Sequence, residues 1–292
     1  MPYIPHSEKE IREMLQTVGA ASIEELLFEG VQPPMLPADV RVKKGLKTLH
    51  KGISEQELSC ALNDLAARNS PAGGLSCFLG AGAYNHYIPA TVDALISRSE
   101  FYTAYTPYQP EISQGTLQAI FEYQTLVCQL TAMDVSNASL YDGASAVAEA
   151  VLMARRITGR DKVYLSAALH PEYRETVRTY LKGAGDHVYD VFFCTDKGTT
   201  LAGAVEKAVG DDPACLVIQH PNFFGCLEEL EELSALIHRK KGLLIAVTNE
   251  GVSLGLLKPP GDCGVDIDVG DLQSFGNTIS FGGPYLGFMA TR

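Results

Sequence analysis

The sequence predicts an α/β fold, in which helices cover a seven-stranded, mainly parallel sheet that follows a helical N-terminal arm. Two observations support this prediction. From about residue 115 onward, short apolar runs rich in β-branched residues alternate with amphipathic stretches, and three Ser-x-x-Glu patterns occur in the first seventy residues. Strands that alternate with helices form parallel sheets with right-handed crossovers. Ser-x-x-Glu is typical of helix starts.

The N-terminal region is expected to be a short helical arm. In each pattern the serine can cap the first helical amides while the glutamate returns a hydrogen bond; the pairs are Ser7 with Glu10, Ser22 with Glu25, and Ser54 with Glu57. Residues 32–37 contain three prolines, which remove amide donors and predict an extended connector. We therefore divide the chain into a helical arm, residues 1–75, and a large α/β domain, residues 76–292.

The large domain is predicted from periodicity and β-branched content. The expected strands are 137–141, 162–167, 187–194, 214–219, 243–247, 265–269 and 285–290. The expected helices are 117–130, 144–158, 171–182, 201–209 and 227–241. Within the last of these, four glutamates at 228, 229, 231 and 232 are interpreted as a solvated helix face.

Composition excludes several classes of function. The formal net charge of -12 disfavours a nucleic-acid partner, which requires a basic face. No window approaches the roughly 18 continuous apolar residues of a membrane span, and no cationic leader precedes an apolar stretch, so we expect a cytoplasmic protein. The seven cysteines include no C-x-x-C pair, so they are expected to be reduced, buried thiols, and no metal site is predicted.

Ligands of such sheets bind beyond the carboxyl ends of the strands, which directs attention to the segments after each strand. Asp142, Gly143, Ala144 and Ser145 lie at a strand-to-helix turn, where free amides can receive a phosphate. A simple helix cap by Asp142 or Ser145 explains the same residues equally well. His170 lies at a similar junction, from which an imidazole can stack on a flat ring, although a capping or exposed histidine is the more common case.

Two loops concentrate hydrogen-bonding side chains between glycines and prolines. Their candidate site residues are Tyr84, Asn85, His86 and Tyr87 in the first loop, and Tyr105, Tyr108, Glu111 and Gln114 in the second. Loops of this composition serve binding or catalytic sites. The alternative is a structural loop that is held by proline and by buried tyrosine hydroxyls.

Several motifs carry a resemblance to a known family. They are Tyr3-Ile4-Pro5-His6, the Phe78–Pro89 and Tyr105–Gly115 loops, Leu140–Ala146, Gln219–Gly225, Ser253–Gly261 and Ser280–Gly287. Across its whole length the chain resembles the glycine cleavage system P-protein family, and within it the subunit 1 (α) chains. The resemblance implies a fold type I large domain of the pyridoxal phosphate (PLP) dependent transferases. It also implies a smaller C-terminal domain beyond Arg292, so the chain is expected to be C-terminally truncated.

The resemblance also implies that this chain does not anchor the cofactor. Gln273 stands where the sister chain has the lysine that forms the Schiff base with PLP, and residues 246–249 lack the aspartate expected beside the pyridine nitrogen. The pocket of Asp142–Ser145 and His170 is then vestigial. PLP is expected on a lysine of the partner, the subunit 2 (β) chain.

The function implied by the resemblance belongs to a two-chain complex, a heterotetramer. It decarboxylates glycine through PLP and transfers the aminomethyl group to the lipoyl-lysine of the H-protein, while the two tyrosine-bearing loops reach the partner's active site. The isolated chain is expected to be inactive. Two alternatives stay open: a self-sufficient PLP enzyme that uses Lys258, and a non-catalytic scaffold subunit.

Overall fold

The computed structural model describes residues 6–28, 52–71 and 74–292, except 77, 79, 81, 103, 104, 184, 186 and 284. The chain forms two compact units, Met1–Pro71 and Ala72–Arg292. The first unit contains α1 (Glu8–Val18), α2 (Ile23–Phe28) and α4 (Glu55–Ala66). The predicted connector, residues 32–37, lies outside the described residues, as does most of the Tyr3–His6 motif.

The three predicted helix starts of the first unit are confirmed. At the start of α1, the amide of Glu10 donates to Oγ of Ser7 at 3.4 Å, and the amide of Ser7 donates to the Glu10 carboxylate at 2.6 Å. Helix α4 begins with the same reciprocal pair. Helix α2 follows Ser22, whose hydroxyl accepts from the amide of Glu25 at 3.1 Å.

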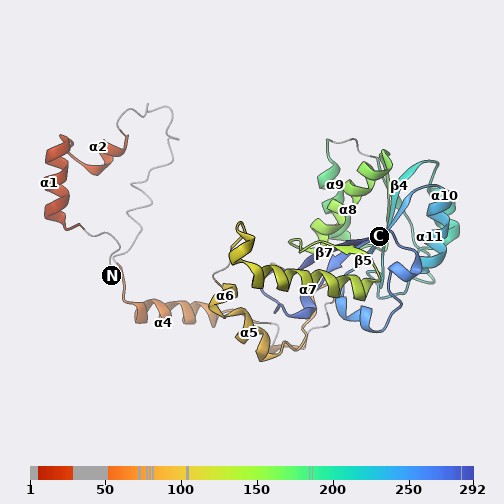
Figure 1. Ribbon diagram of the computed structural model, residues 1–292, viewed down its shortest axis with the longest axis horizontal. Coiled ribbons are helices and arrows are strands. Elements are labelled where there is room, and N and C mark those ends of the chain that lie inside the picture. The colour runs from red at the N-terminus through yellow and green to blue at the C-terminus, as the bar shows by residue number, and fades with distance from the viewer. Residues whose placement is uncertain are drawn as a thin grey trace. The chain divides into compact units, whose positions relative to one another are not determined.

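The second unit is built on one seven-stranded sheet (Figure 1). Its strands are β1 (Val135–Ser136), β2 (Lys162–Ser166), β3 (Val188–Val191), β4 (Pro213–Gln219), β5 (Leu243–Thr248), β6 (Ile267–Asp271) and β7 (Gly287–Thr291). Their order is β1-β7-β6-β5-β4-β2-β3, and β7 alone runs antiparallel to its neighbours. This is the mainly parallel sheet that the sequence predicts, and its carboxyl ends meet along one edge.

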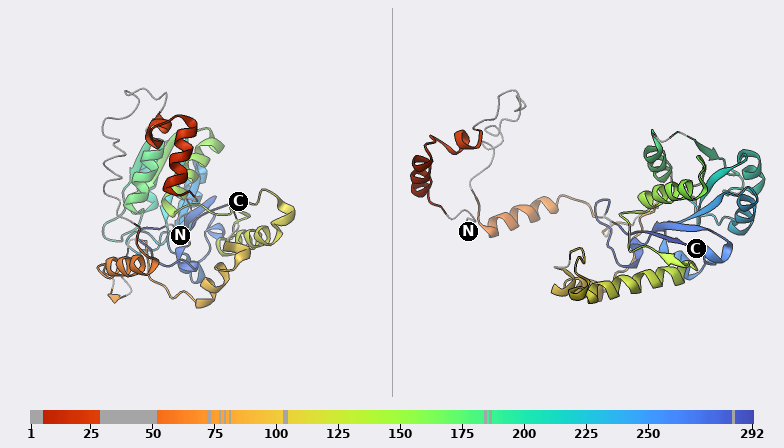
Figure 2. Two further views of the ribbon diagram at one scale, coloured as in Figure 1. Left: turned by 90° about the vertical axis from the view of Figure 1, so that its left-hand side faces the viewer. Right: turned by 45° about the horizontal axis from the view of Figure 1, so that its top comes forward.

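Helices cover both faces of this sheet (Figure 2). The second unit also contains α5 (Ala90–Ile96), α6 (Ser99–Tyr102), α7 (Gln114–Thr131), α8 (Gly143–Thr158), α9 (Pro171–Leu181), α10 (Ala202–Ala208), α11 (Leu230–Arg239) and the 3-10 turns η3 (Pro110–Ile112), η4 (Gly251–Gly255), η5 (Gly261–Cys263) and η6 (Gln273–Phe275). Apolar residues of α8 and α9 pack on one face, and those of α7, α10 and α11 pack on the other. The central strands are buried on both sides, which explains their unbroken apolar sequence.

Some predicted boundaries are wrong for local reasons. The strand expected at 137–141 is wrong: β1 covers Val135–Ser136, and in 137–141 only Leu140 forms a bridge, to Gly287, while the side chain of Asn137 accepts from the amide of Met289 at 3.1 Å. Helix α11 begins at Leu230, three residues later than predicted. The interpretation of Glu228 as part of a solvated face is also wrong, because this side chain is buried.

Glu228 instead connects the loop after β3 to the loop after β4. Its carboxylate accepts from the amide of Thr200 and from Nδ2 of Asn222, both at 2.7 Å. These bonds hold residue 228 outside the helix, so α11 starts after it. The cysteine prediction is corrected as well: Cys215 is buried, whereas Cys60 is exposed.

Candidate functional site

The side chains singled out at strand ends meet at the carboxyl edge of the sheet. Helix α8 begins there, and β2, β4, β5 and β6 end there. The loops after β2 and β4 are tied together, because the amide of His170 donates to Oε1 of Gln219 at 2.8 Å. The edge therefore has the position of a ligand site in open α/β sheets.

Carboxylates of the chain itself occupy the N-terminus of α8. Oδ1 of Asp142 accepts from the amide of Ser145 at 2.7 Å, and the hydroxyl of Ser145 completes a capping box. Oδ2 of Asp271, at the end of β6, accepts from the amide of Gly143 at 3.2 Å. Burial raises the pKa of the Asp271 carboxyl above its usual range. Two of the first three amides are thus unavailable to a phosphate, and the cap reading of Asp142 and Ser145 is confirmed.

An aromatic ring of the chain fills the space beside this helix start. The ring of Tyr173 stacks on the imidazole of His170, with centroids 4.8 Å apart and planes 30° apart. Its hydroxyl donates to Oδ1 of Asn249 at 2.5 Å. A Cβ atom added to Gly143 would lie 2.4 Å from the same hydroxyl oxygen, so the tyrosine abuts the first turn of α8. His170 therefore does stack on a flat ring, and that ring is a tyrosine.

These contacts do not fit PLP. The ring of Tyr173 already lies against His170, and a phosphate at the start of α8 would compete with Asp142 and Asp271 for the same amides. Gln273 is buried. Its backbone amide donates to Oδ1 of Asp271 at 2.8 Å, and its side-chain amide donates to the carbonyl of Asn277. A carboxamide has no basic amine to bond a carbonyl carbon. Side chains of the chain itself therefore hold two amides at the start of α8 and lie against the ring of His170.

The loop predicted to carry a site lies against the end of β5. Nε2 of His86 is 2.9 Å from Oε2 of Glu250, and a Cβ on Gly82 would meet Nδ2 of Asn249 at 2.3 Å. Residues 246–249 contain no aspartate, and the carboxylate at this strand end is that of Glu250, one residue further on. Its position directly after the buried strand β5 marks it as part of the carboxyl-edge loop 248–250. Tyr173 was missed because a tyrosine one turn into a helix carries no sign of its contacts.

Most of the other candidate residues are exposed. Tyr87, Tyr105 and Tyr108 are 87%, 82% and 78% exposed, and the rings of the last two lie 6.3 Å apart. The alternative that buried tyrosine hydroxyls hold these loops is therefore wrong. Tyr84, Asn85, Glu111 and Gln114 are also exposed. The structure pairs Tyr105 with Tyr108 and His86 with Glu250.

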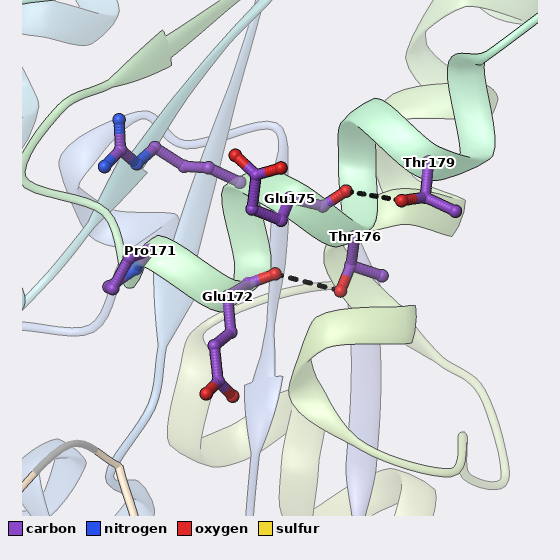
Figure 3. A pocket seen from close by; sticks show the side chains of 6 residues that line it. Pro171, Glu172, Glu175, Thr176 and Thr179 are labelled. Atoms are coloured by element: carbon purple, nitrogen blue, oxygen red, sulfur yellow. Dashed lines mark hydrogen bonds between the residues drawn. The ribbon is translucent and has the colours of Figure 1, made fainter.

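A hollow on the outer face of α9 does not qualify as a site (Figure 3). It has a volume of about 450 Å³, and its lining residues all come from that single helix. The hydroxyls of Thr176 and Thr179 donate to the carbonyls of Glu172 and Glu175, each at 2.9 Å. Both hydroxyls are thus satisfied within the helix, and the lining contains no polar group from a second element that could converge on a ligand.

Lys258 lies in a surface ion pair. Its ammonium is 2.5 Å from Oε1 of Glu231 on α11, and its side chain is 55% exposed. This hydrogen bond raises the pKa of Lys258 above its usual value. A lysine that reacts with a carbonyl needs the opposite shift, because only the neutral amine is a nucleophile. The geometry gives no support to Lys258 as a cofactor-binding lysine.

The described residues contain neither a cluster of metal ligands nor a helix that could span a membrane. Within residues 6–28, 52–71 and the described part of 74–292, no three or more metal-ligating side chains cluster. In that same part of the chain, no helix is both long and apolar enough to cross a membrane.

Comparisons with known proteins agree with the fold. The family model described as glycine cleavage system P-protein matches residues 1–292. A relative from Carboxydothermus hydrogenoformans, "Probable glycine dehydrogenase (decarboxylating) subunit 1", is 51% identical over 292 residues, which are 100% of this chain and 64% of the relative. A relative of the same description from Syntrophomonas wolfei is 53% identical over 293 aligned residues, with 99% of this chain and 64% of the relative covered.

Solved structures give the same result. A crystal structure of "glycine decarboxylase (P-protein) of the glycine cleavage system, in inhibitor-bound form" superposes with a TM-score of 0.83 at 45% identity, over 100% of this chain and 63% of that one. A sphingosine-1-phosphate lyase from Burkholderia pseudomallei, with a TM-score of 0.61 and 17% identity over 84% of this chain and 60% of the lyase, shares the fold alone. The fold is that of a fold type I large domain, as expected. The chain spans somewhat less than two thirds of the length of these relatives.

Proposed function

The chain belongs to the glycine cleavage system P-protein family, and from this premise we propose that it is the subunit 1 (α) chain of a two-chain glycine decarboxylase. The complete enzyme, a heterotetramer with subunit 2 (β) chains, would release the carboxylate of glycine as carbon dioxide. It would transfer the remaining aminomethyl group to the lipoyl-lysine of the H-protein. The relatives named subunit 1 support this proposal, because such a name implies a second subunit.

We assign the cofactor to the partner chain. PLP supplies the electron sink that the loss of a carboxylate requires, and it needs a lysine and a free helix N-terminus to be held. This chain has Gln273 at the position of the lysine, and Tyr173 and Asp271 occupy the space at the start of α8. A lysine of subunit 2 is therefore the proposed attachment point, and the present chain contributes residues around it.

One observation carries the proposal: a tyrosine-bearing loop extends from the carboxyl edge of the sheet, beside a pocket that is itself filled. Tyr84 and Tyr87 leave the edge from the loop that contacts Asn249 and Glu250, and their rings face solvent. Exposed tyrosines combine apolar area with a hydroxyl, which suits a site formed between two chains. We assign them, with Asn85, the task of orienting glycine or the lipoyl arm and of excluding water.

The second loop is assigned to the same site. Tyr105 and Tyr108 pair their rings, and Glu111 and Gln114 follow in η3 and at the first position of α7. Together they offer one carboxylate, one amide and two phenols. We propose that these groups hydrogen-bond the substrate, the lipoyl group or the partner's cofactor.

The test is substitution in the assembled enzyme. Tyr84, Tyr87, Tyr105 and Tyr108 are each replaced by phenylalanine, and glycine-dependent carbon dioxide release is measured with both subunits and lipoylated H-protein. We expect at least one variant to lose about tenfold or more in kcat/KM, since one hydrogen bond to a reacting group contributes about 1.5–3 kcal/mol. Tyr180→Phe is the matched control, because Tyr180 is an exposed tyrosine on α9, outside both loops. Full activity of all four variants, and of their alanine counterparts, would favour the scaffold alternative.

A further inference from the structure

The loop that carries Tyr84, Asn85 and Tyr87 is attached to the sheet edge at two points. At the first point, Gly82 lies so close to Asn249 that a Cβ at position 82 would be 2.3 Å from the amide nitrogen of that side chain. Gly82 also has a φ of +90°, which an L-residue rarely adopts. At the second point, His86 bonds Glu250. Both points lie directly after β5.

Glu250 is itself held in place. Its Oε1 accepts from the amide of Val252 at 3.1 Å, and its carbonyl accepts from the hydroxyl of Ser253 at 2.7 Å. Its Oε2 is the atom 2.9 Å from Nε2 of His86, and the two side chains are only 24% and 32% exposed. Each oxygen of the carboxylate therefore has one partner, and the start of η4 determines its direction.

His86 differs from its neighbours in this respect. Its ring points back toward the end of β5, whereas Tyr84, Asn85 and Tyr87 on both sides of it are exposed. One ring nitrogen is occupied by Glu250, so the imidazole is oriented by the sheet edge and not by a ligand. Of the four residues in this loop, His86 has the geometry of the anchor.

The filled pocket supports the same anchor from below. Asn249 packs against Gly82, and its Oδ1 accepts a hydrogen bond from the hydroxyl of Tyr173. The ring of Tyr173 in turn stacks on His170. Residues that fill the space of a cofactor thus lead through Asn249 to the loop, at the end of the strand that also carries Glu250. The contacts of Tyr173 and Asn249 therefore give the loop a fixed base.

We propose that Glu250 is a positioning residue, which holds His86 and thereby sets the direction in which Tyr84, Asn85 and Tyr87 leave the carboxyl edge toward the partner's active site. This inference rests on the proposed function, because it takes that site as the destination of the loop. Glu250 acts through His86 and touches neither substrate nor cofactor. A displacement of about 1 Å in a positioned group costs up to about 100-fold in rate, so a residue of this kind has a measurable effect on catalysis.

The first measurement needs no catalysis. The rate of chymotryptic cleavage after Tyr84 and Tyr87 is compared in the full chain for the wild type, Glu250→Ala and Glu250→Gln. Alanine removes the acceptor of His86, and we expect cleavage of this loop to become about threefold to tenfold faster, which corresponds to the loss of one ordinary hydrogen bond. Glutamine keeps an acceptor oxygen and is expected to retain most of the protection. Glu231→Ala, which removes another paired carboxylate on α11, is the matched control.

The second measurement uses the two-chain enzyme. We expect Glu250→Ala to lower kcat by roughly 10- to 100-fold, with a smaller change in KM for glycine, and Glu250→Gln to restore most of the activity. Unfolding midpoints show whether each variant is folded, and the glutamine variant tests the proposal if the alanine variant is not. Unchanged cleavage after Tyr84 and Tyr87 in Glu250→Ala, or faster cleavage with full activity, would overturn the positioning role.

Tyr84→Phe and Tyr87→Ala separate this result from a failure of the proposed function. If these variants lower activity while Glu250→Ala does not, the loop serves the active site and only the positioning role is wrong. If neither the tyrosine variants nor Glu250→Ala changes activity, the assignment of the loop to the partner's site is wrong, and the positioning role is overturned with it.

Discussion

Replacement of Tyr173 is the most direct way to perturb the filled pocket. Tyr173→Phe removes the hydroxyl that donates to Asn249 at 2.5 Å, and we expect a loss of about 1 kcal/mol in the free energy of unfolding. Tyr173→Ala also removes the ring that stacks on His170 at 4.8 Å. Partial ring burial and the aromatic pair add about 2 kcal/mol, so the alanine variant should lose about 3 kcal/mol.

Urea unfolding followed by circular dichroism measures both losses, and Tyr180→Ala on the same helix is the control, expected within about 0.5 kcal/mol of wild type. Tyr173→Ala leaves a cavity of the size of the removed phenol ring, and p-cresol has the same shape as the lost side chain. Binding of p-cresol should therefore raise the unfolding midpoint of this variant and leave that of the wild type unchanged. If Tyr173→Ala and Tyr180→Ala lose equal stability and p-cresol has no effect, Tyr173 does not fill a pocket and the reasoning is refuted.

Two further predictions concern buried carboxylates. Glu228→Ala strips the acceptor from the amide of Thr200 and from Asn222, so it should cost about 3–5 kcal/mol in unfolding free energy, whereas Glu229→Ala should stay within about 0.5 kcal/mol; equal losses in urea would contradict the account. Asp268 is completely buried, which raises its carboxyl pKa well above 3.8, and its side chain accepts from the hydroxyl of Thr248 at 3.1 Å. Because the pKa of Asp268 is raised in the folded state, its stabilising contribution is fully present below pH 3.8 and is lost as pH rises through the folded-state pKa. Asp268→Asn removes this titration, so the free energy of unfolding should fall less steeply with pH, by up to about 1.4 kcal/mol per pH unit. Identical pH profiles of the variant and the wild type would rule this out.

Local pattern was sufficient for most of the fold. The apolar runs of β4 and β5 and the amphipathic stretches of α8 and α9 carry their structure within a few residues, so their existence and order were predictable. The three capping pairs of the arm are equally local, because serine and glutamate lie three residues apart. The resemblance to a family predicted the fold type, which periodicity alone does not distinguish from other parallel sheets.

Contacts between distant residues account for what the sequence argument missed. Glu228 meets a loop 28 residues away, and this contact delays the start of α11. Tyr173 reaches Asn249 across 76 residues, and His86 reaches Glu250 across 164. No periodicity signals such pairs, because each side chain has an ordinary local setting. The contacts of Tyr173 with His170 and Asn249 at the carboxyl edge are of this kind, so the residues around them gave no sign of them.

The central claim is that this chain does not hold PLP and that its partner does. The most direct test adds PLP to the chain alone and to the chain with subunit 2, records the visible absorbance, reduces with borohydride and maps the labelled lysine. The account predicts that the chain alone acquires no label and that in the complex the label lies on a lysine of the partner. A stoichiometric label on Lys258, or on another lysine of this chain, would contradict it.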